Sequence, residues 1–156
     1  MSDIIRIWVE ISHQAAFRSG GWAFVRAEGS ALSGAAGGER SASPDRIALA
    51  GLLEAFTDLP PNAAVEVLSA TPGIAGAGRR VSEIEADQGA ENLELWARLS
   101  AALKARPIRF SAAANQPRTP TAFAIAWAEL ARDKAKTRPF RAAIPKVNLM
   151  KAGVPA

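Results

Sequence analysis

Hydrophobic patterns of two kinds succeed one another along this chain in an order that few folds can accommodate. Apolar patterns typical of β-strands occur at 4–10, 22–27, 31–36, 64–69 and 107–111. Apolar residues at helical spacing indicate α-helices at 44–59, 93–103 and 121–136, the second of them capped by Asn92. Three strands in succession can pair as a meander, and the later strands are separated by helices. The sequence therefore predicts an α/β fold.

The composition excludes several kinds of functional site. The chain has 156 residues, with 19 Lys and Arg against 15 Asp and Glu, one His and no Cys. Without Cys there is no disulfide, no thiol nucleophile and no zinc held by thiolates, so a metal site would need oxygen ligands, which suit Mg²⁺ or Mn²⁺. No apolar run approaches the roughly 20 residues of a membrane span, and the first residues carry no secretion signal. We therefore expect no membrane partner and a cytoplasmic location.

Positive charge is concentrated near the C-terminus. Residues 132–156 hold seven basic residues and one acid, so their net charge is 7 − 1 = +6, whereas residues 1–131 hold twelve and fourteen, giving 12 − 14 = −2. Because Pro and Gly interrupt this segment, we expect a domain of residues 1–136 followed by a basic tail, 137–156, that is extended or poorly ordered. The tail is either a solubilising end or a nucleic-acid-binding arm whose deletion would remove most of the binding.

Five short segments together resemble the motifs of a known family. They are the Gly-Gly-Trp step at 20–22, Ser-Pro-Asp-Arg-Ile-Ala-Leu at 43–49, Val-Leu-Ser-Ala-Thr-Pro at 67–72, Leu-Glu-Leu-Trp-Ala-Arg-Leu at 93–99 and Ala-Glu-Leu-Ala at 128–131. In order and spacing they are similar to type I ribonuclease H, over about residues 4–136. The resemblance implies a ribonuclease H-like fold, in which a five-stranded mixed sheet begins with an antiparallel meander, continues with parallel strands and is flanked by helices.

The resemblance also implies where catalytic groups should lie. The family uses two divalent ions, held by four carboxylates, to cleave a phosphodiester bond. The four positions correspond here to Glu10, Ala48, Thr71 and Ala128, of which only Glu10 is a carboxylate. Asp45 lies one helical turn before Ala48. An acid in the first turn of a helix is favoured by the helix dipole, so Asp45 has a structural explanation that involves no metal. If any metal binds, its ligands are Glu10 and Asp45, which offer too few anionic oxygens for two Mg²⁺ ions.

We therefore hypothesise a ribonuclease H-like pseudoenzyme without two-metal cleavage and without a cofactor, acting as a nucleic-acid-binding or protein-interaction module. The alternative is an endonuclease of RNA–DNA hybrids with a rearranged, weaker site for Mg²⁺ or Mn²⁺. The partners under the first hypothesis are RNA, DNA, an RNA–DNA hybrid or a protein. The segment 79–91, where some family members carry a basic protrusion, holds more acids than bases and argues against phosphate contacts there. The candidate nucleic-acid contacts are Ser43, Lys134, Lys136, Arg138 and Arg141.

The aromatic residues and the single histidine have structural explanations. Trp22, Trp96 and Trp127 fall in predicted core positions, whereas Trp8 shares a strand face with charged residues and is the exception. His13 falls in a predicted loop, where we expect it to be solvated. The expected apolar face of the last helix consists of Phe123, Ile125, Trp127 and Leu130.

Overall fold

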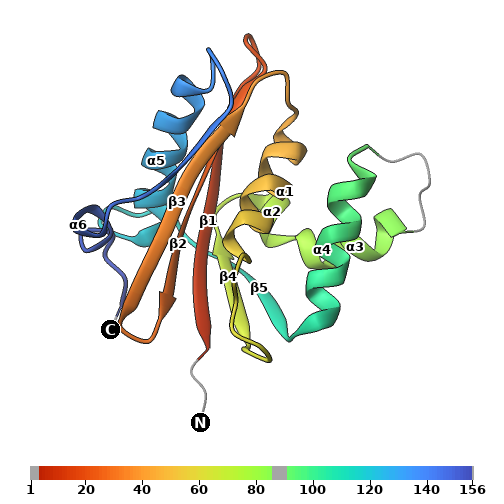
Figure 1. Ribbon diagram of the computed structural model, residues 1–156, viewed down its shortest axis with the longest axis vertical. Helices are drawn as coiled ribbons and strands as arrows, with labels where there is room; N and C mark the ends of the chain where they lie inside the picture. The colour runs from red at the N-terminus through yellow and green to blue at the C-terminus, as the bar shows by residue number, and fades with distance from the viewer. Residues whose placement is uncertain (1–3, 86–90, 156) are drawn as a thin grey trace.

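A six-stranded mixed sheet lies at the centre of the molecule (Figure 1). The structure is a computed structural model that describes residues 4–85 and 91–155. The strands are β1 (Ile5–Gln14), β2 (Ser19–Glu28), β3 (Ala31–Glu39), β4 (Val65–Ser69), β5 (Ile108–Ala112) and β6 (Phe140–Ala143). In the order β5-β4-β1-β2-β3-β6, the first three strands of the chain form an antiparallel meander, and β4 and β5 run parallel to β1. The mixed sheet is confirmed, with one strand more than the five expected.

Helices cover both faces of the sheet, with α1 on one side and α5 on the other (Figure 1). They are α1 (Pro44–Ala55), α2 (Pro72–Ala75), α3 (Ala77–Glu85), α4 (Leu93–Ala105), α5 (Pro120–Lys134) and α6 (Lys146–Leu149). Ser43 caps α1, because its hydroxyl accepts a hydrogen bond from the amide of Arg46 at 3.2 Å. Asn92 precedes α4 in a left-handed conformation, φ 62°, and makes no side-chain cap. None of the helices in the described ranges has the length and apolarity of a membrane span.

The two faces of the sheet are packed with side chains of different size. The α1 face is filled by branched residues such as Ile7, Val9 and Leu52. On the other face α5 buries alanines, and it approaches β2 so closely that a Cβ on Gly21 would lie 2.2 Å from the carbonyl oxygen of Ala128. The prediction that Leu130 belongs to the apolar face of this helix is therefore wrong, since Leu130 is 55% exposed. Small side chains face the sheet because larger ones would not fit in this contact.

The C-terminal segment belongs to the sheet, so the expectation that it is extended or poorly ordered is wrong for most of its length. β6 pairs antiparallel with β3 and supplies the sixth strand. After it, Ile144, Leu149 and Ala152 are buried. The prolines limit helix length here, yet they leave room for a four-residue strand. The buried residues are too widely spaced to give a periodic signal in the sequence.

Trp8 shows what this segment covers. It is 5% exposed and packs in one cluster with Val25, Ile144 and Leu149, so the expectation that Trp8 is an exception to packing is wrong. Near the lower end of the same strand, Nη2 of Arg6 donates to the carbonyl oxygen of Pro155 at 2.9 Å. The first strand and the last residues of the described chain are therefore in direct contact.

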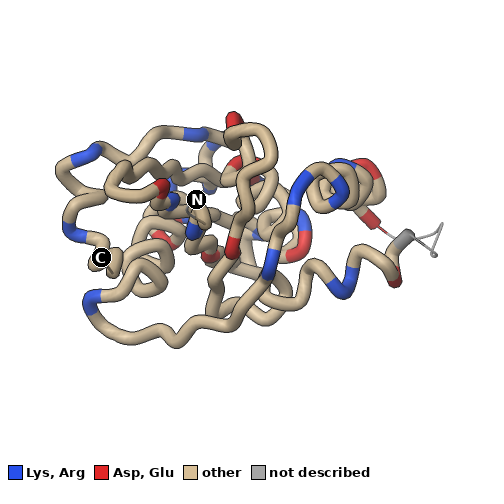
Figure 2. Tube along the Cα trace, turned by 90° about the horizontal axis from the view of Figure 1, so that it is seen from below, with Lys and Arg blue, Asp and Glu red and all other residues tan. Residues whose placement is uncertain are grey.

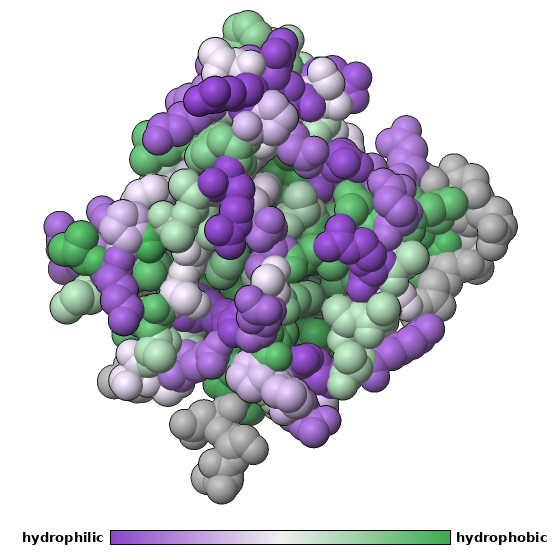
Figure 3. Space-filling view, viewed as in Figure 1, coloured by the Kyte–Doolittle hydropathy of each residue, from purple (hydrophilic) through white to green (hydrophobic). Residues whose placement is uncertain are grey.

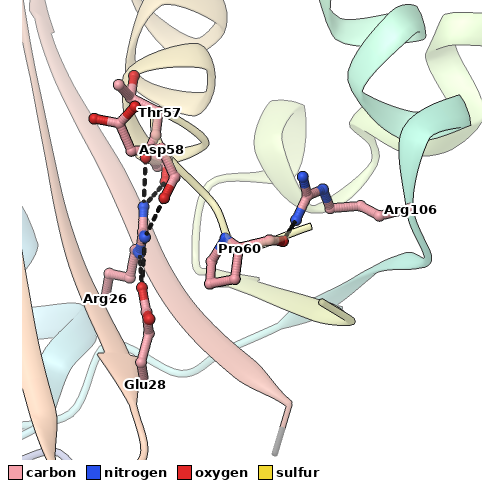
Figure 4. Close-up of polar contacts among 7 residues, drawn as sticks. Arg26, Glu28, Thr57, Asp58, Pro60 and Arg106 are labelled. Carbon is pink, nitrogen blue, oxygen red and sulfur yellow. Dashed lines mark hydrogen bonds and ion pairs between the residues drawn. The ribbon is translucent and has the colours of Figure 1, made fainter. Parts of the chain in front are cut away.

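A buried arginine joins the sheet to the end of α1 (Figure 4). Arg26 of β2 is 9% exposed, and its guanidinium donates to the carbonyl oxygens of Thr57 at 2.7 Å, Asp58 at 3.2 Å and Ala55 at 3.4 Å. Its Nε also donates to Glu28 at 2.7 Å. A cation at this place satisfies carbonyl groups that the helix itself leaves unpaired, and it opposes the negative end of the helix dipole.

Candidate functional site

Glu10, the first of the expected ligand positions, lies in the second half of β1 on the face covered by α5. Its partner in the register with β2 is Ala23, which packs against that helix. Because β1 and β4 are parallel, their C-terminal ends lie at the same end of the sheet. Thr71, which follows β4, therefore comes next to Glu10 although the two are 61 residues apart in the sequence.

The Glu10 side chain is 1% exposed, and its carboxylate accepts hydrogen bonds from the segment at the end of β4. The hydroxyl of Thr71 donates to Oε1 at 2.9 Å, and the amide of Ala70 donates to Oε2 at 2.7 Å. Burial raises the pKa of Glu10 above its ordinary value of 4.5, and the hydrogen bonds oppose this shift without cancelling it. Within residues 4–85 and 91–155, no Lys, Arg or His forms an ion pair with this carboxylate.

The other two expected ligand positions lie within packed helix faces. Ala48 is 6% exposed in the cluster under α1, and Ala128 is completely buried among the alanines of α5. Neither position adds an oxygen ligand. The structure therefore brings Glu10 and Thr71 together and leaves one carboxylate where the two-metal mechanism uses four.

Asp45, the second candidate metal ligand, is engaged away from Glu10. Both of its carboxylate oxygens accept hydrogen bonds from Arg80 of α3, at 3.0 and 3.3 Å. In the part of the chain that the structure describes, no group of three or more His, Asp and Glu side chains is placed to hold a metal ion. The residues present do not fit the two ions that the resemblance implies, because hard divalent ions need several anionic oxygens converging on one point.

A second region gathers cations where the β1–β2 turn meets the end of α5, at the upper end of Figure 1. The loop after β3 joins the turn through a 3.0 Å hydrogen bond from the amide of Ala42 to the carbonyl oxygen of Arg18. Nη1 of Arg40 donates to the carbonyl oxygen of Thr137 at 3.2 Å, which ties the same loop to the segment after α5. We call this region the basic end. Its basic side chains are Arg18, Arg40, Lys134, Lys136 and Arg138.

Two aromatic rings lie among these cations. Phe17 is 61% exposed, and the ammonium group of Lys136 lies 4.9 Å from the centre of its ring. The ammonium group of Lys134 lies 5.8 Å from the ring centre of Phe140. Both distances are within the range of cation–π attraction. Rings of this kind beside cations are the groups on which nucleic-acid bases stack.

The candidate nucleic-acid residues do not all lie together. The three cations of the 134–138 segment belong to the basic end. Ser43 uses its hydroxyl as the cap of α1. Arg141 lies on β6, where its Nε donates to Glu54 of α1 at 3.3 Å. Only part of the expected set is therefore clustered.

Sequence reasoning missed the part of the basic end that comes from turns. Phe17, Arg18 and Arg40 lie in connections without any periodic pattern, and only the neighbouring Gly-Gly step signalled a hairpin. His13 was expected in a solvated loop, and this is wrong: it lies on β1, with its Nε2 2.7 Å from the carbonyl oxygen of Ala42.

The α3 and α4 end of the molecule carries charges of both signs. Figure 2 shows Lys and Arg (blue) and Asp and Glu (red) together on these two helices, beside the grey segment. Asp87, which contributes to the expected excess of acids over 79–91, lies outside the described residues. The described charges do not form a basic surface there.

Comparisons with known proteins identify the fold. No protein-family model and no curated protein matches the sequence. Among solved structures, the chain is similar to the N-terminal RNase H domain of a Mycobacterium tuberculosis protein, solved as a fusion with maltose-binding protein, with a TM-score of 0.63 and 19% identity over 87% of this chain and 98% of that chain.

Two further structures agree. LC11-RNase H1 in complex with an RNA/DNA hybrid has a TM-score of 0.58 and 18% identity, covering 84% of this chain and 98% of that chain. RNase H1 from the halophilic archaeon Halobacterium salinarum has a TM-score of 0.55 and 16% identity, covering 85% of this chain and all of that chain. The protein has an RNase H-like fold.

Proposed function

We propose that this protein is an RNase H-like module that binds nucleic acid through its basic end and does not cleave RNA–DNA hybrids by a two-metal mechanism. The observation that carries the second part is the surroundings of Glu10. Its carboxylate is buried, accepts hydrogen bonds from Thr71 and Ala70, and has alanines at the two remaining ligand positions. A lone carboxylate already engaged in this way cannot assemble two Mg²⁺ ions.

The first part of the proposal is supported by the charge and the rings of the basic end. Its five cations stand against Asp133, a net charge of 5 − 1 = +4. Exposed cations bind nucleic acid by neutralising phosphates and releasing counterions. Phe17 adds an exposed ring on which a base can stack. The similar LC11-RNase H1 was solved with an RNA/DNA hybrid, which favours nucleic acid as the class of partner.

A cleavage assay tests the absence of two-metal chemistry. The full chain is incubated with an RNA–DNA hybrid in the presence of Mg²⁺ and, separately, Mn²⁺. We expect the hybrid to remain intact with both ions. Robust turnover that disappears in the Glu10→Ala variant would contradict the proposal and support the rearranged metal site.

A pair of charge-matched variants tests the binding surface. Lys136→Gln/Arg138→Gln removes two charges from the basic end, whereas Lys146→Gln/Lys151→Gln removes two exposed charges from α6 and the residues after it. Fluorescence anisotropy with an RNA–DNA hybrid, repeated over a range of salt concentrations, measures affinity and its salt dependence. We expect only the first variant to weaken binding and to reduce the slope of log K against log salt by about 2. Equal behaviour of the two variants would contradict the proposal.

Substitution is the appropriate test because deletion of residues 137–156 would do more than remove charge. It would take away β6 and uncover Trp8 and Val25, which the C-terminal segment buries. Loss of binding in such a truncation would follow from loss of structure.

A further inference from the structure

A groove with a volume of about 450 Å³ lies between α1 and α4 on one side and β3 and β6 on the other. Its apolar lining residues include Trp22, Leu53 and Leu95, and the backbone of Phe140 borders it on β6. In Figure 3, hydrophobic side chains (green) lie between hydrophilic ones (purple) in the middle of this view. The volume falls within the range of sites that bind small organic groups.

Three arginines border the groove, and two of them are paired with acids of the described residues. Arg46 pairs with Glu39 at 3.4 Å, and Arg141 pairs with Glu54 at 3.3 Å. Arg98 of α4 is exposed and pairs with no acid among the described residues. The lining cations and acids therefore sum to 3 − 2 = +1. An apolar surface with one uncommitted guanidinium suits a ligand that has a flat apolar part and one anionic group.

The groove adjoins the basic end at Phe140, the first residue of the edge strand β6. Phe140 also borders a smaller hollow of about 270 Å³ together with Lys134, Thr137 and Arg138, and its ring is directed to this side, where it packs against the alanines of α5. A strand whose phosphates lie on the basic end can therefore pass around the start of β6 and reach Arg98. A duplex keeps its bases paired inside, so only a single strand can place a base in such a groove.

We propose that the groove receives one nucleotide of a single-stranded segment, with its base on the apolar surface that Leu53 and Leu95 help to form and its phosphate at Arg98. This inference rests on the proposed function, since the basic end holds the adjoining phosphates. It adds a site for an unpaired strand that the basic end alone does not provide.

Two variants of different kinds test the groove. Arg98→Gln removes the guanidinium, and Ala50→Phe fills the groove from α1, where Ala50 is only half-buried. Lys104→Gln removes an exposed charge from the same helix, at a position that does not line the groove, and serves as the control. Circular dichroism and thermal unfolding establish that each variant is folded. If Ala50→Phe does not fold, Arg98→Gln decides alone.

Affinity is measured by anisotropy with a short oligothymidylate and with an RNA–DNA hybrid. We expect both groove variants to bind the oligothymidylate about tenfold more weakly, because Ala50→Phe removes the space for the base and Arg98→Gln removes the contact with its phosphate. We expect both to bind the hybrid within about twofold of the unmodified protein. Unchanged affinity of the groove variants for the oligothymidylate would overturn the inference, as would failure of the unmodified protein to bind it. If the Lys136→Gln/Arg138→Gln variant binds both probes normally, the proposed function itself fails.

Discussion

Two buried charged side chains lie on neighbouring strands, and the fold treats them differently. Arg26 of β2 has a carboxylate and three carbonyl oxygens around its guanidinium. Glu10 of β1 has hydrogen-bond donors from Ala70 and Thr71, and no cation of the described residues pairs with it. Burial of a charge stabilises a fold only when its partners replace the water that it loses. The comparison indicates that Arg26 is part of the framework, whereas the charge of Glu10 opposes folding.

The largest expected effect comes from placing a second carboxylate near Glu10. Ala128→Asp would put a charge into a completely buried alanine cluster that offers no cation, so we expect the free energy of unfolding to fall by about 4 kcal/mol at pH 7. Urea denaturation measures the change. Ala126→Asp, on the exposed side of the same helix, is the control and should cost no more than about 0.5 kcal/mol. Equal stability of the two variants would show that the interior beside β1 accepts charge.

A smaller loss should follow removal of the well-partnered charge. Arg26→Met leaves Glu28 and the carbonyl oxygens at the end of α1 without their donor, and we expect it to cost about 3 kcal/mol in urea denaturation. Arg109→Met is the control, because the Arg109 side chain is 70% exposed beside Glu66 and its ion pair should contribute less than about 1 kcal/mol. If both variants lose the same small amount, the contrast with Glu10 would not hold.

Neutralising Glu10 should raise stability, in a way that depends on pH. The pKa of Glu10 is raised in the folded protein, so ionisation costs more there than in the unfolded chain, and the unmodified protein loses stability as pH rises from about 4.5 through the native pKa. Glu10→Gln avoids this cost, since its amide oxygen can accept from the Ala70 amide while its amide nitrogen donates to the Thr71 hydroxyl. We expect a higher thermal midpoint than that of the unmodified protein at pH 7 and no difference near pH 3.5, where both side chains are neutral. A lower midpoint at pH 7 would show that the carboxylate stabilises the fold.

The smallest expected effect is that of divalent ions. With too few oxygens to bind them, Mn²⁺ and Mg²⁺ should leave the thermal midpoint unchanged in both the unmodified protein and Glu10→Gln. A midpoint that rises with Mn²⁺ concentration in the unmodified protein alone would show that Glu10 holds a metal. Glu10 would then have a cation as its partner, as Arg26 has a carboxylate.

The fold could be predicted to a large extent because its signals are local. Alternating apolar residues, the cap at Ser43 and the Gly-Gly step each depend on a few neighbouring residues. The buried face of α5 could not be predicted in this way. Leu130 is more hydrophobic than Ala128, yet the close approach of this helix to Gly21 leaves space only for the smaller side chain. The structure of the C-terminal segment could not be predicted for a related reason, since its strand has only four residues and its buried positions are widely spaced.

The candidate site was less accessible to sequence reasoning. The resemblance located Glu10, but the burial of its carboxylate and its contact with Thr71 depend on two strands that are far apart in the sequence. The basic end is built from two turns and a helix end, so no single stretch of sequence contains it. The groove beside Arg98 depends in addition on the position of β6, which the sequence did not reveal.

The contact between Trp8 and α6 has a consequence for the time at which the protein can fold. During synthesis the first strands appear early, but the side chains that cover Trp8 and Val25 include Ile144 and Leu149, which come much later in the sequence. Until these residues leave the ribosome, one face of the meander stays open to water. Contacts between segments so distant in the sequence also slow the folding of the free chain. A nascent chain that does not yet include residues 144–149 should therefore expose an apolar surface of the kind that chaperones bind.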